Sequence, residues 1–257
     1  MSADELSLVE HNLVASMRQV SPGLEGVAAI LVSGSHYAAD FGRTHETEAF
    51  KREQYDFHAA MAQYEASSSF LYTVDMDAGI IAHTKRVVRA VPGMHRLTGG
   101  RTGLEMIDDR LSATDLAQAG TLAELLDYHQ ITDTETCLNI ATNSSTGRAP
   151  LSREKPYGLL SYKAIFELTR QEGIDHVFAY LNQQAIRSLS HLGLSYGLLG
   201  GREFHLPRVG AEEGYDMAYQ AVCIDATPEN IAIFSQANPA RPFTQLVAGH
   251  AVPLFYL

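Results

Sequence analysis

Apolar and polar residues alternate along the chain in two periods, which predict a protein built from both helices and strands. Residues 2–18 have the pattern of an amphipathic helix, because Ser2 and Glu5 have capping-box spacing and apolar residues follow at helical intervals. A second helical pattern covers residues 44–64. Between them, residues 23–35 are apolar without a clear period, which fits either a strand or the start of a buried helix.

The strand pattern begins at residue 69. Residues 69–75 (SFLYTVD) and 80–88 (IIAHTKRVV) are rich in β-branched and aromatic residues, and turn-forming residues separate them. The pair is therefore predicted to form a hairpin. A Gly-rich loop at 92–102 follows, and Thr121 with Glu124 has the spacing that opens a short helix.

The second half of the chain alternates strands with helices. The predicted elements are a strand at 136–142, a polar loop at 143–157, a helix at 158–172, a strand at 175–181, a helix capped by Asn182, and strands at 217–225 and 230–235. A strand–helix–strand unit of this kind is expected to form a right-handed parallel crossover. The predicted fold class is α/β (mixed α+β), with a central mixed twisted sheet and helices on both faces, in one domain spanning residues 1–257.

Composition excludes several classes of protein. Apolar residues make up 46% of the 257 residues, which is too many for a disordered chain, and no apolar run approaches the roughly 18 residues of a membrane helix. The N-terminal residues lack a basic segment followed by an apolar one, so no signal peptide is expected. Cys137 and Cys223 lie far apart in apolar stretches, which favours core thiols and a cytoplasmic protein. The eleven histidines have no metal-ligand spacing, so no metal site is predicted.

The net charge of −11 argues against nucleic acid and anionic membranes as partners. The charge is uneven, because residues 85–101 contain no acidic residue. The basic residues of this segment are Lys85, Arg86, Arg89, Arg96 and Arg101. They are predicted either to dock an anionic partner or to form the solvated edge of a strand.

The loop before the predicted helix at 158–172 has features of a phosphate-binding loop. A helix N-terminus presents free N–H groups and the positive end of the helix dipole. Gly158 allows close approach of a ligand, and Arg153 and Lys155 add positive charge. The alternative is that this loop is an ordinary turn that binds no ligand.

The segment Arg153-x-x-Pro156-x-Gly158 resembles the Arg/Gln-x-x-Gly-x-Gly/Ala loop with which N-acetyltransferases of the GNAT superfamily hold the pyrophosphate of coenzyme A, with Pro in place of the first Gly. A second family segment has an Asn, an Ala three positions later, and a Gly and an apolar residue eleven and twelve positions later. This chain matches it at Asn182, Ala185, Gly193 and Leu194. The resemblance covers roughly residues 69–200 and implies a GNAT-like acyltransferase fold. The donor-binding residues that it implies are Arg153, Lys155, Tyr157, Gly158, Leu159 and Asn182.

Within the superfamily the chain looks most like the acyl-homoserine-lactone synthases and the long-chain N-acyl amino acid synthases. Arg86 is followed by Val-Val and then Pro92, a long insertion comes next, and Glu135 stands just before the strand at 136–142. An Arg three positions after that Glu is typical of autoinducer synthases, whereas this chain has Leu138. The resemblance implies an N-acyltransferase that takes an acyl group from acyl carrier protein or acyl-CoA and transfers it to the amine of a small molecule such as an amino acid. The acyl-CoA or acyl-phosphopantetheine would be a co-substrate, and no permanently bound cofactor is expected.

Several side chains are candidates for the chemistry. The attacking amine must lose a proton, and Glu135 is the first candidate to receive it, with a surface carboxylate as the alternative. His83 is the second candidate, or a packed core histidine, and His176 at the start of a strand is similarly ambiguous. Asn139 is expected to orient the substrate. The superfamily often has a Tyr as general acid seven positions after the Asn, where this chain has Leu189. Tyr196 or Tyr180 would take over this role; the alternative is that each is a buried tyrosine that only packs in the core. A short-chain acetyltransferase and a catalytically degenerate acyl-CoA-binding regulatory module remain alternative functions.

Overall fold

The computed structural model describes residues 1–50, 61–89, 105, 120–148, 155–202, 205–206, 219–235, 241–247 and 250–257. The helices in this part of the chain are α1 (Ala3–Val20), α2 (Ala39–Phe50), α6 (Leu122–Tyr128), α7 (Tyr157–Glu172), α8 (Gln183–His191) and α9 (Pro228–Ser235), with short 3₁₀ turns η2 (Glu65–Ser67), η3 (Thr134–Thr136) and η4 (Leu199–Gly201). The strands are β1 (Val27–Ser33), β2 (Ser68–Asp75), β3 (Ile80–Arg89), β4 (Cys137–Ser145), β5 (His176–Asn182), β6 (Gly197–Leu198), β7 (His205–Leu206), β8 (Tyr219–Asp225), β9 (Arg241–Val247) and β10 (His250–Tyr256).

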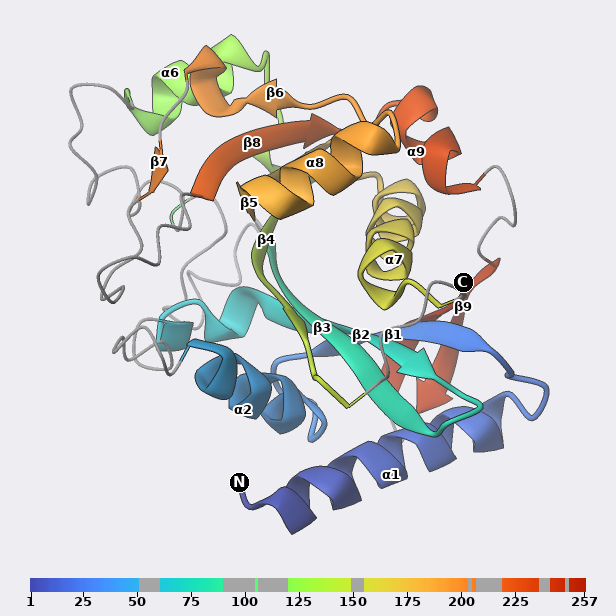
Figure 1. The fold of residues 1–257 in the computed structure, drawn as a ribbon. Helices are drawn as coiled ribbons and strands as arrows, with labels where there is room; N and C mark the ends of the chain where they lie inside the picture. Colours follow the sequence, from blue (N-terminus) through green and yellow to red (C-terminus); the bar gives the residue numbers. More distant parts are fainter. Residues whose placement is uncertain are drawn as a thin grey trace.

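These strands form one ten-stranded mixed sheet (Figure 1). Its order is β6-β8-β5-β4-β3-β2-β1-β10-β9, and β7 also pairs with β8. The β4–β5 pair is parallel, with α7 as its crossover, whereas the other pairings between described strands are antiparallel. The mixed sheet and the predicted hairpin of β2 and β3 are thus confirmed.

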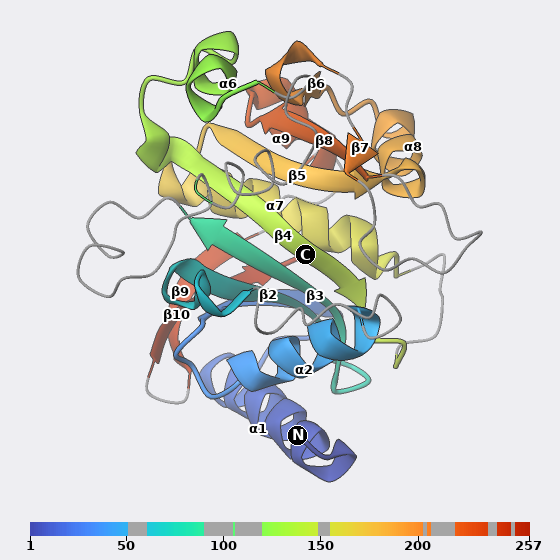
Figure 2. The ribbon, with the colours of Figure 1, turned by 90° about the vertical axis from the view of Figure 1, so that its left-hand side faces the viewer.

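Helices cover both faces of the sheet (Figures 1 and 2). On one face α1 buries Leu13 and Met17 against β1 and β2, while α6 packs over β4, β5 and β8. On the other face, α7, α8 and α9 share a core with the central strands. Each large apolar side chain removed from water in these cores contributes roughly 1.5–3 kcal/mol. No helix among the described residues has the length and apolar character needed to cross a membrane.

Local sequence signals place the helix ends correctly. The capping box of Ser2 and Glu5 opens α1, and the equivalent box of Thr121 and Glu124 opens α6. Gly173 ends α7 in a left-handed conformation, with φ of 66°. The Asn182 Oδ1 accepts a hydrogen bond of 2.8 Å from the Ala185 N–H at the start of α8.

Some predicted elements need correction. Residues 230–235, predicted as a strand, belong to helix α9 instead. Pro228 is the first residue of α9, where it needs no N–H partner, and the Thr227 hydroxyl accepts a hydrogen bond from the Asn230 N–H at 3.2 Å. The ambiguous apolar run at 23–35 forms strand β1. No element was predicted after residue 235, where β9 and β10 add a hairpin to the sheet beside β1.

Candidate active site

Strands β4 and β5 pair at their N-terminal ends and then diverge (Figure 2). Their parallel register runs from Cys137 opposite His176 to Ile140 opposite Ala179, although β4 continues to Ser145 and β5 to Asn182. Within the described residues, the facing edges of both strands beyond this register have no strand partner. Strand edges that separate in this way are places where an extended molecule can add main-chain hydrogen bonds.

A β-bulge in β4 lies at the start of this divergence. Arg86 of β3 is opposite Thr142, but Val87 is opposite Ile140, so Ala141 has no counterpart on β3. A bulge leaves its extra residue unpaired in the ladder and is common beside active sites. Ala141 also lies just beyond the last residue of β4 that pairs with β5.

A buried ion-pair network holds the bulge against α2. Arg86 and Glu46 are each 1% exposed, and the Arg86 guanidinium donates to both Glu46 oxygens at 2.7–3.1 Å. The Thr142 hydroxyl donates to Glu46 and accepts from the Arg86 N–H. Arg86 also pairs with Glu65, which is joined in turn to Arg43. The shape of β4 at the bulge therefore depends on charged groups contributed by α2 and η2.

A second buried polar cluster lies on the opposite face, between β3 and α7. Lys85 is fully buried, donates a hydrogen bond to Asn143 Oδ1, and lies 3.7 Å from the centre of the Tyr162 ring. Neither His83 Nδ1 nor the Tyr162 hydroxyl has a hydrogen-bond partner in the described part of the chain. Burial lowers the pKa of Lys85 well below its usual value, and burial together with the nearby Lys85 does the same for His83. Groups perturbed in this way are concentrated at functional sites.

Lys85→Met is expected to raise the free energy of unfolding at neutral pH by about 1–3 kcal/mol, because it removes a buried amine that pairs with no carboxylate of the described residues. The pKa of Lys85 is lowered in the folded state, so the unfolded state binds more protons until pH exceeds about 10.4. The parent should therefore gain stability as pH rises toward that value, and the variant should lack this gain. Urea unfolding from pH 7 to 10 measures both slopes. Lys155→Met is the control, because Asp77 and Asp75 raise the pKa of Lys155. Lys155 is therefore mostly protonated in both the folded and the unfolded state from pH 7 to 10, and its removal should leave the slope of the parent nearly unchanged. If the free energy of unfolding rises equally with pH in the parent and in Lys85→Met, the pKa of Lys85 is not lowered in the folded state.

The N-terminus of α7 is fastened to the turn between β2 and β3. The Lys155 amine pairs with Asp75 at 3.0 Å and with Asp77 at 2.9 Å, and the Tyr157 hydroxyl donates to Asp75 at 2.6 Å. Burial acts to raise the pKa of Asp75, but these partners and the Ala78 N–H lower it overall. Among the residues that the structure describes, a β-carbon added to Gly158 would meet no atom closer than His83 Nε2 at 4.0 Å, so these residues leave the first turn of α7 open at this point. The first-turn N–H of Leu159 bonds to the Pro156 carbonyl at 2.9 Å.

The predicted catalytic residues do not gather in one place. Asn139 is buried one pair before the end of the β4–β5 register, close to the divergence. Glu135 is exposed in η3, before the N-terminal end of β4 and six residues before Ala141. The four residues from Cys137 to Ala141 alone span roughly 13 Å of strand. Tyr196 packs against the core of α7 and α8 with its hydroxyl 3.5 Å from Ser190 Oγ, and Tyr180 packs below α6. The structure thus places Asn139 and Tyr180 near the point where the strands diverge and His83 at the start of α7.

The predicted docking surface requires correction. Lys85 and Arg86 are 0% and 1% exposed, so neither side chain can contact a partner's surface. Arg89 is paired with Glu172 at 2.8 Å. The cause is that β3 is a central strand covered by α2 on one face and by α7 on the other, which buries its polar residues as well. Arg96, Arg101 and the predicted donor-binding Arg153 lie outside the described residues.

Several site residues were not found from the sequence. Glu46, Glu65 and Thr142 meet Arg86 only through the tertiary fold. On the far side of β5, His176, Cys223 and Asp225 converge although no metal-ligand spacing exists in the sequence. The two cysteines are free and buried, as predicted. Burial raises the pKa of the Cys137 thiol to about 12.

Comparison with known proteins agrees with the fold. No protein-family model and no curated protein matches the sequence. Among solved structures, FeeM, an N-acyl amino acid synthase from uncultured soil microbes, is similar over 80% of this chain and 93% of that one, with 13% identity and a TM-score of 0.52. The acyl-homoserine lactone synthase LasI matches over 83% of this chain and 96% of that one, with 10% identity and a TM-score of 0.47. MesI, a CoA-dependent acyl-homoserine lactone synthase, matches over 81% of this chain and 94% of that one, with 16% identity and a TM-score of 0.41. The chain therefore has the mixed α/β, GNAT-like fold that the sequence motifs implied, at low sequence identity to its structural neighbours.

Proposed function

We propose that the protein is an N-acyltransferase that moves an acyl group from acyl-CoA or an acyl carrier protein to the amine of a small molecule such as an amino acid. The observation that carries this proposal is the divergence of β4 and β5 beside the bulge at Ala141, in a fold similar to that of FeeM. Such a geometry supports binding of an extended thioester donor with its carbonyl oxygen held by a backbone N–H.

The donor's pantetheine arm is expected to lie between the two strands beyond Ile140 and Ala179. It carries two amide groups on a flexible chain, and the described parts of β4 and β5 are not paired with each other there. An extended ligand that pairs with open strand edges gains affinity from main-chain hydrogen bonds. A pantetheine arm is common to coenzyme A and acyl carrier protein, so this part of the site accepts either donor.

The reaction needs few protein groups. The neutral amine attacks the thioester carbon and forms a tetrahedral oxyanion. The carbon–sulfur bond then breaks and a thiolate leaves, and the proton that the nitrogen gives up passes through water to this thiolate, which becomes the free thiol. We assign the Ala141 N–H as a donor to the oxyanion, because Ala141 is unpaired in the ladder with β3 and lies beyond the ladder with β5. Asn139, one pair before the end of that register, is the candidate for orienting the substrate. Glu135 remains a predicted base that the described geometry does not support.

The donor's phosphate groups are expected at the N-terminus of α7. The helix dipole and the open first turn at Gly158 favour an anion there. Lys155 contributes less than predicted, since two carboxylates already neutralise it. The N–H groups of Tyr157 and Leu159 already bond to carbonyl oxygens. The interaction therefore rests on the helix dipole, on the Gly158 N–H and, as a prediction, on Arg153.

The direct test combines purified full-length protein with acyl-CoA and acyl carrier protein donors of several chain lengths and with a panel of amino acids and other small amines. We expect release of free thiol together with one N-acyl product, detected by mass spectrometry. Only short acyl chains reacting would favour an acetyltransferase. Donor binding without any transfer would favour a regulatory module, and neither binding nor transfer would overturn the proposal.

Gly158→Asp is expected to weaken binding of acyl-CoA by about tenfold or more while stabilising the fold. An acidic residue in the first helical turn interacts favourably with the helix dipole, by about 0.3–1 kcal/mol, but repels a phosphate bound at the same place. Calorimetric titration with acyl-CoA and thermal unfolding measure the two effects.

Gly158→Asn is the matched control, because it has the same size and carries no charge. A neutral side chain of this size should leave most of the donor affinity intact. Equal donor affinity in the Asp and Asn variants would show that no phosphate binds at this turn.

A further inference from the structure

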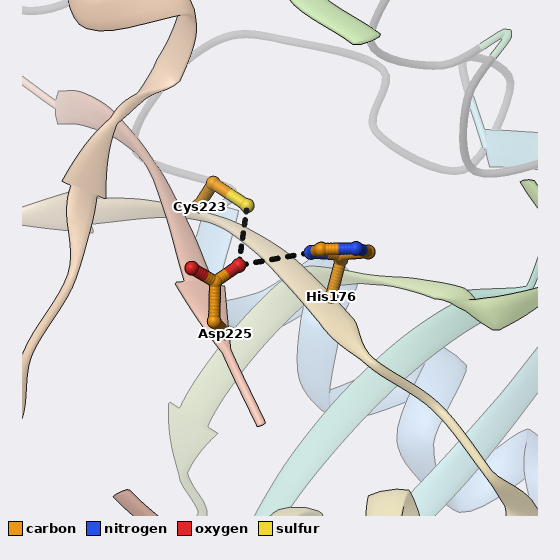
Figure 3. Close-up of side chains that lie close together, drawn as sticks. All are labelled: His176, Cys223 and Asp225. Atoms are coloured by element: carbon orange, nitrogen blue, oxygen red, sulfur yellow. Dashed lines mark hydrogen bonds and ion pairs between the residues drawn. The ribbon is translucent and has the colours of Figure 1, made fainter. Parts of the chain in front are cut away.

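Three metal-ligating side chains converge on one face of the sheet, away from the diverging ends of β4 and β5 (Figure 3). His176 is the first residue of β5 and is directly opposite Asp225 of β8, while Cys223 lies two residues before Asp225 on the same strand. Opposed residues, and residues two apart on a strand, project to the same face of a sheet. The three side chains therefore meet because of the β5–β8 register, although 47 residues or more separate His176 from the other two in the sequence.

The donor atoms are spaced as a bound transition metal requires. His176 Nδ1 lies 2.9 Å from Asp225 Oδ1, Cys223 Sγ lies 3.8 Å from the same oxygen, and all three ligand atoms are within 4.8 Å of one another. Tetrahedral zinc bonds of about 2.0–2.3 Å separate their donor atoms by roughly 3.3–3.7 Å. Shifts of about 1 Å or less in the side chains would thus bring the three atoms onto one ion.

Burial of the three side chains suits a site with one open position. Cys223 is 2% exposed, whereas the side chains of His176 and Asp225 are 18% and 56% exposed, so one side faces solvent. The neighbouring His129 is engaged elsewhere, because its Nε2 accepts the Gly200 N–H at 3.0 Å. The backbone that carries the ligands is fixed by the seven-residue β5–β8 register and by a hydrogen bond of 2.8 Å from the Ala226 N–H to the Asp175 carbonyl. Ligands on paired strands are held more precisely than ligands on loops.

We propose that His176, Cys223 and Asp225 form a binding site for a zinc-class divalent ion, with water as the fourth ligand. One sulfur, one nitrogen and one oxygen donor favour Zn²⁺ or Co²⁺ over Mg²⁺ and Ca²⁺, which bind oxygen. Binding forms a metal–thiolate bond, and the Cys223 thiol proton is released to solvent. Because the site is at the N-terminal end of β5, the ion joins β8 to β5 and stays apart from the proposed transfer chemistry.

The test uses untagged full-length protein that has been dialysed against a chelator and is then titrated with Co²⁺ alone. We expect one equivalent to bind with a thiolate-to-cobalt charge-transfer band, and one equivalent of Zn²⁺ to abolish the band and raise the melting temperature. Cys223→Ala should remove the band, and Asp225→Asn should weaken Co²⁺ binding by about 10–100-fold or more.

Cys137→Ala is the matched control, since Cys137 is equally buried on the same face, opposite His176, but is not part of the cluster. It should retain the band and the stoichiometry. The proposal is overturned by weak binding without a charge-transfer band, by a band that persists in Cys223→Ala, or by its equal loss in Cys137→Ala.

Discussion

Glu46→Gln is expected to lower the free energy of unfolding by about 3–5 kcal/mol, the largest effect on stability that the structure predicts. Glu46 is 1% exposed, and its two oxygens accept hydrogen bonds from the Arg86 guanidinium and from the Thr142 hydroxyl. A glutamine of the same shape cannot neutralise Arg86, which is equally buried. Arg86 would keep its ion pair with Glu65, but the Glu65 side chain is 31% exposed. Removing one partner of a buried pair costs far more than the pair contributes in net terms, because a buried charge is left uncompensated.

Urea unfolding of the parent and of Glu46→Gln measures this difference. Glu65→Gln is the control, because it removes a carboxylate from the same guanidinium at a more exposed position, where solvent screens the loss. A much smaller cost is therefore expected for Glu65→Gln. Similar costs for the two variants would show that burial of Glu46 is not the source of the effect.

Ala141→Pro is expected to reduce kcat for acyl transfer by about 10²–10³-fold, the largest effect expected on activity. Proline lacks the N–H that we assign to the oxyanion, and loss of a single oxyanion donor has effects of this size. The substitution is well suited to the position, since bulges are among the few places in a sheet where proline fits. Donor affinity should change little, because the oxyanion exists only after attack.

Ala141→Gly separates loss of the N–H from loss of the side chain. It retains the N–H while removing the contact that Ala141 makes with Met61, Tyr64 and Val88. We expect near-parent kcat for the glycine variant and similar melting temperatures for both variants. If the proline variant is folded and turns over at the parent rate, the Ala141 N–H is not the donor.

Much of the fold was predictable from the sequence, because the signals involved are local. Capping boxes at Ser2 and Thr121, the left-handed glycine at 173 and the cap at Asn182 involve residues within a few positions of one another. The strand–helix–strand order around α7 follows from the periods of its apolar residues. The strand at 230–235 was wrong because its apolar run is too short for its period to distinguish a strand from a buried helix.

The candidate site was less predictable, because pairing across the sheet determines it. The sequence determined which residues are basic, but only the tertiary structure decided that β3 is a central strand, so Lys85 and Arg86 are buried rather than exposed for docking. The bulge at Ala141 follows from the register of β3 against β4, and the cluster of His176 with Cys223 from that of β5 against β8. Register depends on contacts between residues far apart in the chain, and shifting it by one residue would turn every side chain of a strand to the other face. The sequence by itself therefore determined the elements and the superfamily resemblance, whereas the tertiary structure alone decided which polar groups meet, because that depends on long-range pairing.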